Sequence, residues 1–202
     1  MAVLEAQRQG RVVVSHGIEE PKPYTAEEFT RLAAQYPDLR IELTKEGEVT
    51  IMPPAGGETG NRNADLTSDL VIWNRAGKTG KVFDSSTGFV LPNGAERSPD
   101  ASWVELSRWE ALSPEQRKKF VPLCPEFVME LRSSSDRLST VQKKTREYIE
   151  NGAKLGWLID SISRRVEVYR PGQEVEILNA PASLSGENVL PGFTLDLTSI
   201  LS

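Results

Sequence analysis

An acidic residue interrupts the apolar run from Phe127 to Leu131. Glu130 would lie inside a buried strand, where an unpaired carboxylate costs several kcal/mol. Either a nearby cation such as Arg132 or a bound divalent metal ion would make the buried charge tolerable. Alternate residues of a strand share a face, so Glu130 and Arg132 point to the same side. The position therefore predicts a buried ion pair or a metal ligand.

Two further carboxylates could complete a metal site. Asp100 begins an apolar strand directly after a proline, a position at which aspartate often only caps a turn. Glu42 lies between two apolar residues of a predicted hairpin, where a solvent-facing role is the ordinary one. Acids at the same end of neighbouring strands form a site for a hard cation. We therefore expect Asp100 and Glu130 to lie together, with Glu42 as a third candidate.

Two adjacent lysines lie on the helix predicted from Arg137 to Glu150. With about 100° per residue, Leu138 and Tyr148 belong to one apolar stripe of this helix. Lys143 points away from the stripe, whereas Lys144 falls on its border and could extend towards Glu130. The alternative is that Lys144 merely flanks the core.

The chain holds one cysteine, Cys124, and one histidine, His16. Together they cannot form a structural zinc site. They also argue against a Ser-His or Cys-His hydrolase, because the only histidine lies in a polar N-terminal stretch. Any metal must then be held by oxygen ligands, which favours magnesium, manganese or calcium.

The net charge of −5 argues against a general nucleic-acid binder, which usually carries a basic surplus. No apolar stretch approaches the roughly 20 residues of a membrane span, and the N-terminus lacks a signal-peptide pattern. A single cysteine cannot form an internal disulfide bond, which fits a reducing compartment. We therefore expect a cytoplasmic protein with no membrane segment.

The hydrophobic pattern predicts one α/β domain over residues 24–202, preceded by a tail or edge strand over residues 1–23 that includes Val12-Val13-Val14. Helices are predicted over residues 25–36, 58–73, 107–120 and 137–150, the third with a break or second start at Ser113-Pro114. Strands are predicted over residues 41–43, 49–52, 82–83, 88–91, 99–104, 126–131, 155–159, 165–169 and 175–178. The strand–helix–strand unit over residues 126–159 predicts two parallel strands with a right-handed crossover.

Asp100, followed after a strand-sized gap by Glu130-Leu131-Arg132, resembles the PD-(D/E)xK signature of restriction-endonuclease-like nucleases. A wider set of matches is similar to the Uma-two family of predicted endonucleases and covers roughly Tyr24 to Tyr169. The matching segments are Arg40-Ile-Glu-Leu43, Met52-Pro-Pro54, Gly57-Glu-Thr-Gly-Asn-Arg62, Ser98-Pro-Asp-Ala-Ser-Trp103, Val128-Met-Glu-Leu-Arg-Ser133, Gln142-Lys-Lys144, Glu147-Tyr148 and Gly156-Trp-Leu-Ile-Asp160.

This resemblance implies a restriction-endonuclease-like fold, with a central mixed β-sheet flanked by α-helices. It also implies that Asp100 and Glu130 are the metal-binding acids and that Glu42 supports them. The signature's lysine position is occupied by Arg132, which stays protonated and cannot readily act as a base. In several relatives of the wider fold the lysine comes from the following helix, and Lys144 matches such a position.

The resulting hypothesis is a Mg²⁺- or Mn²⁺-dependent endonuclease that hydrolyses DNA. Asp100, Glu130 and the Leu131 carbonyl would hold the metal, Lys144 would position or deprotonate a water, and Arg132 would contact a phosphate. A homodimer is expected, because two copies most simply cut both strands of a duplex. The alternatives are a non-catalytic module for nucleic-acid binding or oligomeric assembly, and a hydrolase of smaller phosphodiesters.

Overall fold

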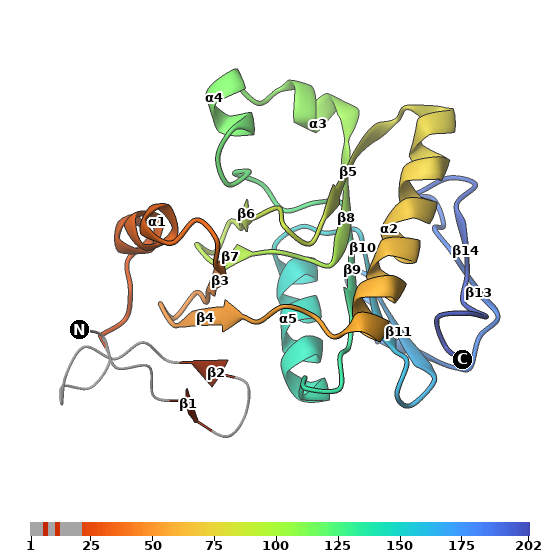
Figure 1. The fold of residues 1–202 in the computed structure, drawn as a ribbon. Coiled ribbons are helices and arrows are strands. Elements are labelled where there is room, and N and C mark those ends of the chain that lie inside the picture. Colours follow the sequence, from red (N-terminus) through yellow and green to blue (C-terminus); the bar gives the residue numbers. More distant parts are fainter. Residues whose placement is uncertain (1–5, 8–10, 13–21) are drawn as a thin grey trace.

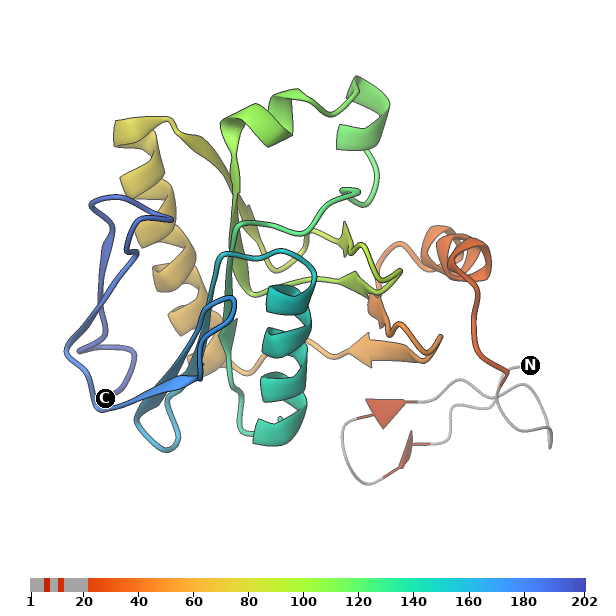
Figure 2. The ribbon, with the colours of Figure 1, turned by 180° about the vertical axis from the view of Figure 1, so that it is seen from behind.

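The chain folds around two main β-sheets with helices on both sides (Figures 1 and 2). The structure, a computed structural model, describes Ala6–Gln7, Arg11–Val12 and residues 22–202. The helices are α1 (Ala26–Gln35), α2 (Gly57–Gly77), α3 (Leu106–Glu110), α4 (Pro114–Arg117) and α5 (Leu138–Glu150). The strands are β1 (Ala6–Gln7), β2 (Arg11–Val12), β3 (Arg40–Leu43), β4 (Val49–Met52), β5 (Gly80–Asp84), β6 (Phe89–Val90), β7 (Glu96–Arg97), β8 (Ala101–Glu105), β9 (Phe127–Leu131), β10 (Leu155–Asp160), β11 (Arg165–Tyr169), β12 (Glu176–Asn179), β13 (Ser183–Ser185) and β14 (Thr194–Asp196).

The larger sheet is mixed and has the strand order β12-β11-β10-β9-β8-β5. Strands β9 and β10 are parallel, and α5 connects them, as the strand–helix–strand pattern predicts. Every other pair of neighbours in this sheet is antiparallel. The predicted α/β class, with a central mixed sheet flanked by helices, is therefore confirmed.

Helices α2 and α5 cover opposite faces of the larger sheet (Figure 1). Leu66 and Leu70 of α2 pack with one side of β9 in the largest hydrophobic cluster, which the C-terminal strands β13 and β14 also join. Tyr148 of α5 packs with Val128 on the other side of the same strand. The alternation within β9 thus sends Glu130 to the α5 side, as its spacing from Val128 requires.

The smaller sheet has the order β4-β3-β7-β6 and lies next to α1. Its β3–β4 hairpin turns through Gly47, which adopts a φ of +84° that favours glycine. Helix α1 begins with a capping box between Thr25 and Glu28, and Phe29 packs against the hairpin. These elements fix the position of Glu42 within β3.

The second start predicted at Ser113-Pro114 is confirmed, because Ser113 and Gln116 form a capping box with Pro114 at the first turn of α4. Other elements differ from the prediction. Helix α2 continues past Trp73 to Gly77. Strands β7, β13 and β14 were not predicted, because strands of two or three residues have no periodicity to detect.

Within the predicted N-terminal segment, β1 and β2 pair antiparallel. Residues 1–5, 8–10 and 13–21, which include Val13, Val14 and His16, lie outside the described residues. In the described part of the chain, no helix combines the length and the apolar character that crossing a bilayer requires.

Candidate active site

Lys144 lies at the centre of a buried cluster that joins both sheets to α5. Its Nζ lies 2.8 Å from Oε1 of Glu42 and 3.0 Å from Oε1 of Glu130. It also donates to the Ser98 carbonyl oxygen at 3.1 Å. The lysine side chain is only 12% exposed, so these contacts occupy its three donor protons in a largely dry environment.

The helical periodicity explains why Lys144 rather than its neighbour reaches the cluster. Lys143 is exposed, whereas Lys144 leaves the border of the apolar stripe of α5 and extends towards β9. The prediction that Lys144 faces the strand of Glu130 is confirmed. Glu42, which would ordinarily face solvent, is 3% exposed because β3 turns it towards α5.

An arginine that the sequence reading missed supports the cluster. Arg97 of β7 contacts Oε2 of Glu42 at 3.2 Å through Nη1 and Oε2 of Glu147 at 2.6 Å through Nη2. The backbone N–H of Ser98 also donates to Glu42 at 3.0 Å. The available signal was the location of Arg97 just before the matched Ser98-Pro-Asp segment. Strand β7 is too short to predict which way the Arg97 side chain points.

Tyr148 is a second site residue that the sequence did not indicate, because its pattern placed Tyr148 only in the core. Its hydroxyl donates to Oε1 of Glu130 at 3.2 Å, and the ring is fully buried. Tyr148 follows Lys144 by four positions on α5, so the two side chains lie on neighbouring turns of one helix face. That spacing could have indicated a shared partner. The carboxylate of Glu130 therefore has contacts from two α5 side chains.

The cluster carries more negative than positive groups. Among the described residues, Glu42, Glu130, Glu147 and the nearby Asp100 face three cations: Lys144, Arg97 and, beside Asp100, Arg40. Burial raises the pKa of Glu130 to about 8, although Lys144 acts against this shift. Ionised together, the four acids would leave a surplus of one negative charge in a low-dielectric region, which a divalent cation would offset.

The other two central groups keep their charge. Burial acts to raise the pKa of Glu42, but the cations of Lys144 and Arg97 outweigh it and hold this pKa below its usual range. Burial acts to lower the pKa of Lys144, but Glu130 and Glu42 outweigh it and raise this pKa. Lys144 therefore holds its proton firmly and resembles an electrostatic anchor more than a base.

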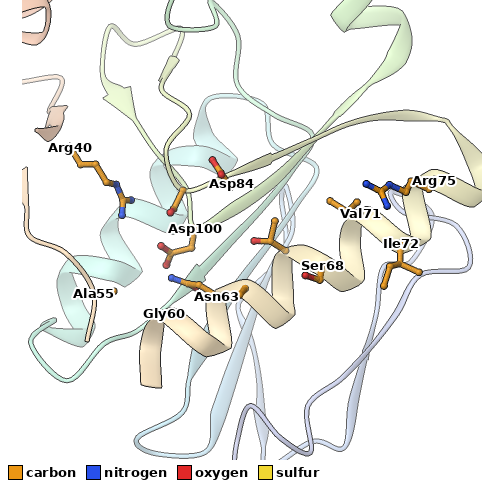
Figure 3. Close-up of a pocket in the computed structure, with 13 residues that line it drawn as sticks. Arg40, Ala55, Gly60, Asn63, Ser68, Val71, Ile72, Arg75, Asp84 and Asp100 are labelled. Carbon is orange, nitrogen blue, oxygen red and sulfur yellow. The ribbon is translucent and has the colours of Figure 1, made fainter. Parts of the chain in front are cut away.

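Asp100 lies at the edge of this cluster, where β8 begins beside the end of β9. Its Oδ2 accepts a hydrogen bond of 2.8 Å from the Leu131 backbone N–H. Burial raises the pKa of Asp100, and the nearby cations Lys144 and Arg40 act in the opposite direction. Asp100 also lines a groove (Figure 3), so it connects the buried acids to the surface.

Arg132 is engaged elsewhere. Its Nη1 donates to Oδ2 of Asp160 at 2.8 Å, and its Nε donates to the Asp136 carbonyl at 3.2 Å. The buried ion pair considered for Glu130 therefore forms with Lys144 and not with Arg132. The buried Cys124 thiol donates to the Tyr148 carbonyl, and burial raises its pKa to about 12, which fits a structural role.

No group of three acidic, histidine or cysteine side chains in the described part of the chain has the arrangement of a metal site. The predicted ligand set is smaller: two carboxylates, from Asp100 and Glu130, and the Leu131 carbonyl. These are hard oxygen donors beside surplus negative charge, so they fit Mg²⁺ or Mn²⁺ with water completing the coordination.

A mixed sheet flanked by helices, with acids from neighbouring strands beside a buried lysine, defines the class of nuclease-fold α/β proteins. The chain belongs to the Uma2 family, described as "Putative restriction endonuclease", whose model matches residues 26–198. This places it among nucleases in general and confirms the resemblance noted in the sequence.

The fold is similar to that of a protein described as a putative nuclease of the DUF820 group from Anabaena variabilis. The TM-score is 0.74 at 21% sequence identity, and the match covers 89% of this chain and 98% of the other. At that identity the likeness supports the fold. No curated protein matches the chain.

Proposed function

We propose that this chain is a metal-dependent endonuclease that hydrolyses phosphodiester bonds of DNA. The observation that carries the proposal is the buried cluster in which Glu130 and Glu42 share Lys144 beside the groove-lining Asp100. Burial raises the pKa of Glu130, and ionising all four acids would leave a surplus of negative charge, which a bound divalent cation would offset.

Asp100, Glu130 and the Leu131 carbonyl would hold Mg²⁺ or Mn²⁺. When bound, such an ion lowers the pKa of a water and stabilises negative charge on the scissile phosphate. Asp100, at the groove, would orient the phosphate relative to the buried acids. Its hydrogen bond from the Leu131 N–H fixes the carboxylate next to the carbonyl of the same residue.

Lys144 would act by position and charge. All three of its donor protons are engaged and its pKa is raised, which favours holding Glu130 and Glu42 in place over removing a proton from water. Glu42 would support the site by fixing Lys144, with Arg97 securing Glu42 in turn. Arg132 would contact a phosphate through the donors that Asp160 and Asp136 do not use.

Isothermal titration calorimetry with Mg²⁺ and Mn²⁺ tests the metal site. Metal binding must expel the proton that Glu130 holds below its pKa of about 8. The apparent affinity is therefore expected to rise about tenfold per pH unit up to pH 8 and then level off. Buffers with different ionisation enthalpies should report release of up to one proton at pH 7 in the wild type.

The variants Glu130→Gln and Asp100→Asn should lose metal binding and, in parallel, cleavage of plasmid or single-stranded DNA. Glu150→Gln removes an exposed acid from the end of α5 and should change neither. Cleavage that persists in a contamination-free Asp100→Asn preparation would contradict the assignment of Asp100. A pH-independent affinity between pH 6 and 8 would contradict a protonated Glu130 as a ligand.

A second candidate is a non-catalytic module that keeps the fold for nucleic-acid binding or assembly. It is favoured by the closure of the ion network, because Lys144 and Tyr148 already engage the Glu130 carboxylate. In such a module the Glu130 carboxylate would serve only to form an ion pair with Lys144. If the wild type binds no metal even with DNA present, this candidate replaces the nuclease.

A further inference from the structure

A groove of about 620 Å³ runs from Asp100 along one face of α2 (Figure 3). Its floor on α2 includes Asn63, Thr67, Ser68 and Val71. These positions, with their neighbours Gly60, Ala64, Ile72 and Arg75, repeat at intervals of three and four and so form one continuous helix face. The groove and the site therefore share one carboxylate, Asp100.

This face of α2 differs in charge from the rest of the molecule. The chain has a net charge of −5, and α2 carries Glu58, Asp65 and Asp69. None of these three acids lines the groove, whose α2 side is neutral up to Arg75. An anionic polymer lying in the groove would thus avoid the acids of this helix.

The Asp100 end of the groove offers donors to a phosphate. The Arg40 side chain points towards Asp100 (Figure 3), and its buried Nε has no hydrogen-bond partner among the described residues. Helix α2 begins nearby at the N-cap Gly56, without a side-chain cap, so its first N–H groups remain available. A Cβ at Gly56 or Gly57 would meet nothing within 4 Å, which leaves this backbone open to a ligand.

The far end of the groove is cationic. A second groove of about 570 Å³ adjoins the first, shares Val71 and Arg75 with it, and is also lined by Lys78 and Lys81. Arg75, Lys78 and Lys81 are exposed and make no ion pair within the described ranges, unlike Arg62 on the same helix. Asp84 and Glu110 are the acids that line these grooves besides Asp100.

We infer that the groove holds one unpaired strand of DNA, with its phosphates running from Arg40 at Asp100 to Arg75 and Lys81. This inference rests on the proposed function and specifies the form of its substrate. From Gly60 to Arg75, α2 is about 22 Å long, which matches a run of several nucleotides. A groove of about 620 Å³ is of the size that encloses small ligands and accommodates one backbone, whereas a paired duplex would stay outside it.

Fluorescence anisotropy in EDTA tests the inference without any cleavage. The probes are a labelled 12-nucleotide single strand of DNA, the same sequence as a blunt duplex, and the same sequence as RNA. Ile72 is 64% exposed in the groove, and Ile162 is 55% exposed in the β10–β11 turn. The single strand should bind the wild type best. Ile72→Glu should weaken this binding about tenfold through repulsion, and the matched control Ile162→Glu should not.

The double variant Arg75→Gln/Lys81→Gln provides a second readout. The slope of log affinity against log salt should fall by about 0.7 for each lost phosphate contact. Lys143→Gln, which removes an exposed cation from α5 on the other face of the sheet, should leave the slope unchanged. All five substituted positions are exposed, so the variants are expected to fold.

The inference is overturned if Ile72→Glu and Ile162→Glu bind the single strand equally well, or if the duplex or the RNA binds more tightly. These outcomes leave metal-dependent cleavage untouched. Conversely, the wild type could bind the single strand through Arg75 and Lys81 but never cleave DNA with Mg²⁺ or Mn²⁺. That result would refute the proposed nuclease activity and support single-strand binding in the groove. The two failures are therefore distinguishable.

Discussion

At the scale of single residues, Lys144 is the cation that stabilises two ionised carboxylates in the core. A buried ion pair gains little over apolar packing, but removing one partner leaves an uncompensated charge, which is costly. Lys144 serves Glu42 and Glu130 at once, so both depend on it. Arg97 partly compensates Glu42, whereas the only cation in contact with Glu130 among the described residues is Lys144.

Lys144→Met should therefore lower the free energy of unfolding by about 3–5 kcal/mol at pH 9.5, well above the pKa of Glu130. At pH 6 the loss should be smaller, because Glu130 is then protonated below its pKa of about 8 and needs no cation. Urea denaturation at the two pH values measures the difference. The neighbouring exposed substitution Lys143→Met should stay within about 0.5 kcal/mol of the wild type. Equal losses for the two variants would contradict a central role for Lys144.

The local residue pattern predicted some site residues and not others. Helical periodicity separated Lys144 from Lys143, and the apolar neighbours of Glu130 indicated its burial. The hairpin pattern could not predict that Glu42 is buried. It indicates which face of β3 carries Glu42, but both faces of this strand are covered in the structure. Arg97 was missed for a related reason: its role depends on contacts with β3 and α5, which are about 50 residues away on either side.

At the scale of elements, the C-terminal end of α2 is attached to the large sheet by one amide side chain. Asn74 donates through Nδ2 to the Gly80 carbonyl at 3.0 Å and accepts through Oδ1 from the Gly80 N–H at 3.1 Å. The same Oδ1 accepts from Trp103 Nε1 at 3.0 Å. The side chain thus joins α2 to β5 and β8, which border the proposed DNA groove.

Asn74→Ala should destabilise the protein by about 1–3 kcal/mol, because it leaves partly buried donors of Gly80 and Trp103 without a partner. Thermal or urea unfolding measures this loss. The exposed residue Asn61 of the same helix provides the control, since Asn61→Ala removes an amide without a hydrogen bond to another element among the described residues. A stability change below that of Asn61→Ala would contradict the anchoring role of Asn74.

Most elements were predictable because their signals are local. Helix α1, the β3–β4 hairpin and the strand–helix–strand unit of β9, α5 and β10 all appear as expected. The assignment of strands to two separate sheets was not predictable. Strands β5 and β6 follow each other in the chain, yet they belong to different sheets, and only tertiary packing determines this.

At the scale of the whole molecule, the distribution of charge matters more than the net charge of −5. Several acids lie within the buried cluster, whereas cations without an ion pair among the described residues lie along α2 and β5. The net charge alone argued against a nucleic-acid substrate. The placement of the charges removes much of that objection, because a charged polymer responds to the local surface.

The homodimer remains a prediction, and light scattering coupled to size exclusion tests it. A dimer is expected if the protein cuts both strands of a duplex, since each copy would supply one site. The expected mass is twice that of one chain at micromolar concentration, with no change on adding EDTA. A monomeric mass would contradict the dimer and would agree with a substrate that is a single unpaired strand.

The cluster around Lys144 draws its members from residues 42–148, and these come from both sheets and α5. Such a site is a late product of folding, because its long-range contacts close only after the elements have docked. The site is also expected to be disrupted early on heating. If the four-stranded sheet opens locally, Glu42 and Arg97 leave together while the hydrophobic core around β9 and β10 persists. Thermal inactivation would then precede global melting, and on cooling activity would return only when the two sheets dock again.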